Sequence, residues 1–77
     1  MQKMKIYKTT EIEVTGLGQK IKKLREASNK PLSTICALIP MSVTNWYRIE
    51  SESQALPLDT LRDIERVLET DFNINID

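Results

Sequence analysis

The chain has 77 residues, a mass of 8.9 kDa and a formal net charge of zero, with 11 basic and 11 acidic side chains. Hydrophobic residues make up 40% of it and charged residues 29%, which is the mix of one ordinary globular domain. There is no histidine and only one cysteine, Cys36, so an internal disulfide, a Cys/His zinc site and a histidine-based catalytic triad are excluded.

The expected location is the cytoplasm. No apolar run approaches the roughly 20 residues that a membrane span needs, so no membrane partner is expected. The first six residues carry charges without a continuous apolar stretch after them, which predicts no signal peptide. A soluble protein of a reducing compartment fits these features.

The neutral total hides an uneven distribution of charge. Residues 1–48 carry nine basic and three acidic side chains, whereas residues 49–77 carry two basic and eight acidic ones. Local potential rather than total charge steers association, so the basic part can still meet phosphate. The alternative is that both parts only solvate their surfaces.

Both ends of the chain alternate between apolar and polar residues, which favours short β-strands. We expect an N-terminal strand segment at residues 1–15 and a C-terminal strand at residues 71–77, either paired with each other or joined to a second chain, because an unpaired apolar strand tends to associate. The apolar positions of these strands are Met4, Ile6, Ile12, Val14, Phe72, Ile74 and Ile76.

Four segments between these ends have the apolar spacing of helices. The first runs from about Leu17 to Ala27 and ends at Asn29, which tolerates the left-handed conformation. The second lies between Pro31 and Pro40. The third spans residues 43–50 with Ser42 as its N-cap, and the fourth follows Pro57. The apolar positions of the first, second and fourth helices are Leu17, Ile21, Leu24, Leu32, Ile35, Cys36, Ile39, Leu58, Leu61, Ile64, Val67 and Leu68.

The third helix has two unlike faces. On a helical wheel, Ser42, Trp46 and Ile49 fall together, and the two large apolar residues can anchor a small core. The opposite face carries methyl groups, a phenol and a guanidinium, which match base edges and phosphates. Its residues are Val43, Thr44, Tyr47 and Arg48. The alternative is an ordinary solvated face with a stacked Tyr–Arg pair.

The ordered series of motifs resembles the phage Cro and repressor family, the XRE-type helix-turn-helix domains. It covers about residues 17–70 and runs through four stretches, which are LGQKIKKLR from Leu17, LSTIC from Leu32, MSVTNWYRIE from Met41 and PLDTL from Pro57. The resemblance implies a mainly α, four-helix, lambda-repressor-like domain at residues 16–70. The alternating segments add short strands at both termini.

The resemblance also implies roles for single residues. Arg25 and Glu50 correspond to an ion pair that ties the first helix to the end of the third. Cys36 takes the place of a small residue at a helix crossing, and we interpret it as a core residue because no histidine is present to activate it. Trp46 and Ile49 match buried positions. The base-reading positions are Val43, Thr44, Tyr47 and Arg48, and the phosphate-contacting positions are Ser42, Asn45 and Ser51.

The chain departs from the family pattern in four places, one of which is the loop after Glu50, where the usual Asn-Gly is missing. Pro40 stands where the turn usually has a left-handed glycine, so the turn must be built differently. Pro31 and Leu32 replace a polar residue at the start of the second helix, which removes a phosphate contact. The expected strand near the C-terminus replaces a fifth helix.

Two functions follow from this pattern. The first is a sequence-specific transcriptional regulator, a repressor that binds double-stranded DNA as a homodimer through its terminal strands and reads the major groove with residues 43–50. The alternative is a protein–protein interaction module that kept this fold and lost DNA binding. An enzyme is not expected, because so small a chain has little room for a substrate pocket. No cofactor, metal or small-molecule substrate is expected. Lys20, Lys22, Lys23 and Lys30 are expected to be solvated, with contact to phosphate as the alternative.

Overall fold

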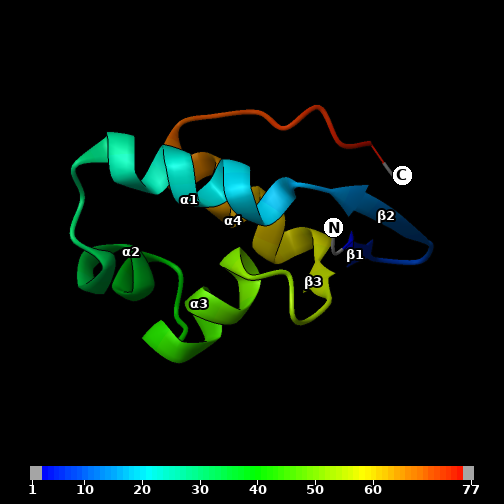
Figure 1. Ribbon diagram of the computed structural model, residues 1–77, viewed down its shortest axis with the longest axis horizontal. Coiled ribbons are helices and arrows are strands. Elements are labelled where there is room, and N and C mark those ends of the chain that lie inside the picture. The colour runs from blue at the N-terminus through cyan, green and yellow to red at the C-terminus, as the bar shows by residue number, and fades with distance from the viewer. Residues whose placement is uncertain (1–2, 76–77) are drawn as a thin grey trace.

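The computed structural model describes residues 3–75, which form four helices and a small three-stranded sheet (Figure 1). In chain order these are β1 (Lys3–Tyr7), β2 (Glu11–Thr15), α1 (Leu17–Ser28), α2 (Leu32–Leu38), α3 (Val43–Glu50), β3 (Leu56–Pro57) and α4 (Leu58–Leu68). All four predicted helices are present within a residue or so of their expected ends. The expectation of a mainly α fold is corrected to a mixed α/β fold, because the sheet is part of the core.

The sheet has the strand order β2-β1-β3, so the first strand of the chain is the central one. β1 pairs antiparallel with β2, with Met4 opposite Val14 and Ile6 opposite Ile12. β1 also pairs in parallel with β3, where Ile6 lies opposite Leu56. Met4, Ile6 and Leu56 are fully or almost fully buried, so the alternation at the N-terminus did mark a core-facing strand.

The structure describes residues 71–75 of the strand expected at residues 71–77. These residues form no strand, so the prediction is wrong there. Asn73 has a left-handed φ of 58°, which breaks an extended run, and its backbone N–H donates to Asp71 Oδ1 at 2.7 Å. Ile76 lies outside the described residues. The sheet takes its third strand from Leu56–Pro57 instead.

The C-terminal segment is held by two side chains of α4. Glu65 Oε2 accepts the backbone N–H of Phe72 at 2.8 Å, and Arg62 Nη2 donates to the carbonyl of Ile74 at 2.5 Å. Arg62 Nη1 also donates to Glu65 Oε1 at 2.7 Å. Arg62 and Glu65 have the three-residue spacing of an exposed pair on one helix, but Glu65 is buried because the segment covers it. The segment runs beside α1, back toward β2 (Figure 1).

Left-handed residues end two of the helices. Asn29, with φ of 61°, follows α1 as predicted, and Glu69, with φ of 54°, follows α4. Lys30 was expected to be solvated, but its Nζ donates to the carbonyl of Val67 at 2.7 Å. A lysine at that place satisfies one of the last carbonyls of α4 and complements the negative end of its dipole.

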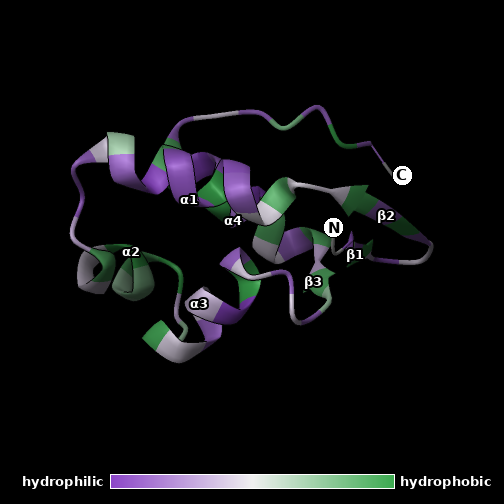
Figure 2. Ribbon diagram, in the orientation of Figure 1, coloured by the Kyte–Doolittle hydropathy of each residue, from purple (hydrophilic) through white to green (hydrophobic). Residues whose placement is uncertain are grey.

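The core lies between the sheet and the helices and contains nearly all of the predicted apolar positions. Its fully buried large side chains are Trp46, Met4, Ile6, Leu17, Ile21, Ile35, Ile49, Leu56, Leu61 and Ile64. Leu24 and Leu32 are only partly buried at its edge. Figure 2 shows that much of the visible side of α1 is hydrophilic, as expected of an amphipathic helix on the surface.

Candidate nucleic-acid interface

The α3 helix begins at a good cap. Ser42 has an extended backbone, with φ of −77° and ψ of 156°, and its Oγ accepts the backbone N–H of Asn45 at 3.0 Å. This bond satisfies one of the otherwise unpaired N–H groups of the first turn. The helical wheel placed Ser42 on the same face as Trp46, but Ser42 is exposed whereas Trp46 is buried.

The two faces of α3 separate as predicted. Trp46 and Ile49 are 0% exposed and hold the helix to the core. Val43 is 42% exposed and Tyr47 is 51% exposed. Thr44 and Arg48 are also exposed, so the four residues of the predicted base-reading set share one open surface. We call these four residues, Val43, Thr44, Tyr47 and Arg48, the α3 face.

A buried carboxylate fixes α3 to α1. Glu50 Oε2 accepts from Arg25 Nε at 2.5 Å and from Trp46 Nε1 at 2.6 Å, and Glu50 Oε1 accepts from Arg25 Nη2 at 3.1 Å. The Glu50 side chain is only 6% exposed and that of Arg25 18%. The hydrogen bonds that Arg25 donates to Glu50 raise the pKa of Arg25, so its charge is permanent. The predicted ion pair is confirmed, and it also holds the indole.

The start of α1 touches the end of α3 at Gly18. The backbone N–H of Gly18 donates to Glu52 Oε1 at 3.0 Å, so the side chain of Glu52 caps α1 from the loop after α3. A Cβ on Gly18 would collide with the carbonyl oxygen of Glu50 and lie 2.8 Å from Glu52 Cγ. Glycine is therefore required for the two helices to approach this closely.

The connection between α2 and α3 contains no left-handed residue. Ile39 is extended, with φ of −115° and ψ of 95°, and Met41 N–H donates to the carbonyl of Cys36 at 3.3 Å. Pro40 therefore follows an extended residue, which is the conformation that a proline imposes on its predecessor. The turn is built without glycine, as the sequence required.

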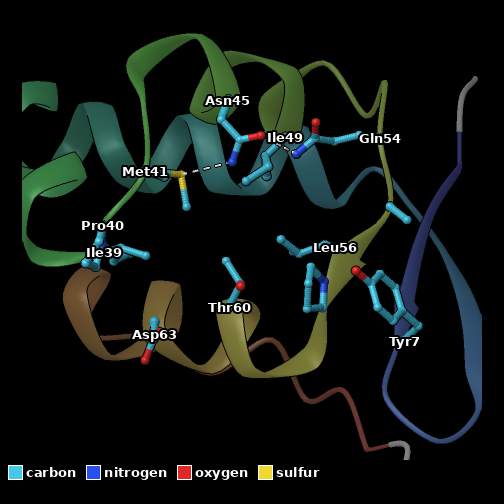
Figure 3. A pocket seen from close by; sticks show the side chains of 12 residues that line it. Tyr7, Ile39, Pro40, Met41, Asn45, Ile49, Gln54, Leu56, Thr60 and Asp63 are labelled. Carbon is cyan, nitrogen blue, oxygen red and sulfur yellow. Dashed lines mark hydrogen bonds between the residues drawn. The ribbon is translucent and has the colours of Figure 1, made fainter.

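Asn45 lies apart from the α3 face. Its Oδ1 accepts from Gln54 Nε2 at 2.8 Å, its Nδ2 approaches Met41 Sδ at 3.7 Å, and the side chain is half-buried. Asn45 and Gln54 line a cavity of about 440 Å³. Figure 3 shows their side chains pointing toward each other, with Thr60 on the opposite wall. The structure thus separates Asn45 from the other predicted contact residues.

Ser51 lies at the other end of α3. Its Oγ donates to the carbonyl of Arg48 at 3.1 Å and lies 3.0 Å from Ser53 Oγ. Both serines are exposed, so their hydroxyls remain accessible next to Arg48.

Two residues that the sequence analysis did not select lie against the same end of α3. Gln19 and Lys22, on α1, line a pocket together with Tyr47, Glu50 and Ser51. The signal that could have found them is the predicted Arg25–Glu50 pair. Lys22 lies one turn before Arg25 and therefore near the side of α1 that faces α3, and Gln19 lies one turn before Lys22.

Cys36 is a buried residue of α2, and burial raises the pKa of its thiol from an ordinary value of 9.0. A thiol in such an environment stays protonated and unreactive at neutral pH. Its place in the core cluster agrees with its interpretation as a packing residue. Within residues 3–75, no group of three or more Cys, Asp or Glu side chains could hold a metal ion.

No protein-family model, curated protein or solved structure matches the chain. In the described part of the chain, no helix has the length and apolar character needed to cross a bilayer.

Proposed function

We propose that the protein is a sequence-specific transcriptional regulator of the XRE helix-turn-helix type that binds double-stranded DNA. In this proposal α3 enters the major groove, and the α3 face reads base edges. Arg48 bonds bidentately to guanine, and the methyl groups of Val43 and Thr44 meet thymine. Ser42 and Ser51, at the two ends of the helix, donate to phosphates.

One observation carries the proposal. The four side chains suited to bases are exposed together, while Trp46 and Ile49 on the same short helix are completely buried. A reading helix needs both properties, because its outer side must fit the groove and its inner side must stay fixed to the domain. The Arg25–Glu50–Trp46 bonds supply that fixation and restrict the angle of α3.

A homodimer that acts as a repressor is part of the proposal. A reading helix of eight residues contacts few bases, and specific affinity usually needs two such modules on a near-palindromic site. β1 is paired on both sides, and residues 71–75 form no strand, so the seam between the subunits is proposed at the outer edge of β2, which follows β1 in the hairpin.

Selection of bound sequences from a random duplex library tests the proposal. We expect one enriched motif with two half-sites about one helical turn apart. The recovered duplex should then shift in a mobility assay at low salt and bind less tightly at moderate salt, because phosphate contacts release counterions. Failure to retain any duplex at low salt would remove the proposal.

The second candidate function is a protein–protein interaction module. It is favoured by the exposed apolar side chains of α3, since Val43 is 42% exposed and Tyr47, at 51%, is the most exposed aromatic residue. Exposed aromatic and aliphatic residues next to an arginine are the composition of interface hot spots. This function predicts no shift of a random duplex at any salt concentration.

A further inference from the structure

We propose that the pocket between α1 and α3 binds one backbone phosphate of the duplex, with Lys22 as its cationic ligand. The junction pocket, as we call it, is lined by Gln19, Lys22, Tyr47, Glu50 and Ser51 and has a volume of about 300 Å³. The inference rests on the proposed function and adds to it a contact from α1, outside the α3 face and its two capping serines.

The structure sorts the lysines that the sequence could not tell apart. Lys30 is engaged with the carbonyl of Val67. Lys20 and Lys23 line a groove between α1 and the C-terminal segment around Phe72. Lys22 lies instead in the junction pocket, beside Tyr47 and Ser51. Of these four lysines, it is the one whose side of α1 faces α3.

The groups in the junction pocket match a phosphate diester. An ammonium, an amide N–H₂, a phenolic hydroxyl and a serine hydroxyl can all donate to phosphate oxygens. Lys22 acts as a point charge, and the hydroxyl of Tyr47 can rotate toward an acceptor. The hydroxyl of Ser51 can donate to a phosphate by leaving the carbonyl of Arg48. A small ligand that binds only through its phosphate would use the same groups. A duplex differs because it brings a phosphate to the pocket while α3 lies in its major groove.

The acidic residue of the pocket does not oppose an anion. Both oxygens of Glu50 are already occupied, by the guanidinium of Arg25 and the indole of Trp46, and its side chain is nearly inaccessible. Arg25 balances the charge of Glu50. Glu52 does not line the pocket, and its Oε1 accepts the backbone N–H of Gly18 in the first turn of α1. Among the side chains that line the junction pocket, the positive charge of Lys22 is therefore the one left unbalanced.

The place of the pocket fits the reach of a duplex. Tyr47 belongs both to the α3 face and to the junction pocket. Two phosphate backbones flank the major groove, so a helix lying in it has a phosphate row along each side. A duplex in contact with Tyr47 then has one of these rows next to α1, where Lys22 lies.

The test measures binding of the duplex recovered by selection, and of an unrelated duplex, between 50 and 200 mM salt. Lys22→Gln should weaken binding to both duplexes by the same factor, because a phosphate contact carries no sequence information. The slope of log K against log salt should fall by about 0.9 per protomer. Between 50 and 200 mM salt, the factor by which affinity falls should thus be about 3.5 times smaller per protomer for the variant than for the parent.

Lys23→Gln is the matched control, since it removes the same charge from the next position of α1, and it should leave the slope unchanged. Lys22→Arg should keep the parent slope. Equal slopes for Lys22→Gln and Lys23→Gln would overturn the phosphate site while leaving the proposed function standing. A parent protein that binds no duplex would overturn both. Thermal unfolding of each variant confirms that it is folded.

Discussion

Trp46 and Glu50, one turn apart on α3, are joined by a hydrogen bond of 2.6 Å between the indole Nε1 and the carboxylate Oε2. The same oxygen accepts from Arg25 on α1. A single carboxylate thus satisfies the polar atom of the largest core side chain and pairs the charge of the neighbouring helix. Glu50 therefore links α1 to α3 through its bonds to Arg25 and Trp46.

Glu50→Ala should lower the free energy of unfolding by about 3–5 kcal/mol, because it leaves the largely buried charge of Arg25 and the N–H of Trp46 without a partner. Asp63→Ala is the control, since it removes an exposed pair in which Arg66 Nη1 lies 2.9 Å from Asp63 Oδ1. It should cost less than about 1 kcal/mol. Urea unfolding measures both values, and similar losses would contradict the role given to Glu50.

Gly18→Ala should destabilise the protein by about 1–3 kcal/mol, because the added methyl group meets the backbone of Glu50 and forces α1 away from α3. Gly16→Ala is a useful comparison. Gly16 has φ of 79° and no atom within 4 Å of a built Cβ, so alanine there suffers only the strain of the left-handed conformation, about 1–2 kcal/mol. Crystal structures of the two variants should show a shift of α1 only in Gly18→Ala, and an unmoved α1 there would be the contrary result.

Glu65→Gln should loosen the C-terminal segment while α4 stays folded. The amide cannot accept at both Oε positions, so either Arg62 or the Phe72 N–H loses its partner. Amide hydrogen exchange should be faster at Phe72 and nearly unchanged at Leu61 in the buried part of α4. Equal protection of Phe72 in the parent and the variant would mean that Glu65 does not hold the segment.

The thiol of Cys36 should make stability depend on pH in the alkaline range. Its pKa is raised by burial, so above pH 9.0 the unfolded chain loses the proton while the folded chain keeps it. The unfolded state then binds fewer protons, and the free energy of unfolding falls as pH rises through that value. The difference in stability between the parent and Cys36→Ala should be constant below pH 8 and shrink above pH 9. A constant difference to pH 10 would contradict burial as the cause.

Arg48→Ala should weaken binding to the selected duplex by about 1–3 kcal/mol and relax the preference at one base pair. Its affinity for an unrelated duplex should change much less. Arg66→Ala removes an exposed arginine from α4 and should change neither quantity. If the loss for Arg48→Ala were the same on both duplexes, Arg48 would contact a phosphate and not a base.

The four helices could be predicted because each combines apolar spacing with a clear boundary. Asn29 ends α1 in the left-handed conformation that asparagine tolerates. The hydroxyl of Ser42 caps the start of α3. The α3 face could be predicted for the same reason, because burial of Trp46 determines which side of so short a helix stays open.

The errors lie where the decisive interactions connect distant parts of the chain. Alternation at residues 71–75 fits a strand, but the backbone of that segment bonds to Arg62 and Glu65, which no local pattern reveals. β3 has two residues, too few for any periodicity. Lys22 differs from Lys23 in sequence only by lying one turn before Arg25, whose pairing with Glu50 brings that side of α1 against α3.

The central position of β1 has a consequence for the order of assembly. Its partner β2 follows at once in the chain, whereas its other partner, β3, is synthesised only after three helices. On the ribosome, one edge of β1 therefore stays open until Leu56 has emerged, and its closure is a late, long-range event. β1 thus waits for a segment that is made after three helices, and the nascent chain has to keep that edge from pairing elsewhere in the meantime.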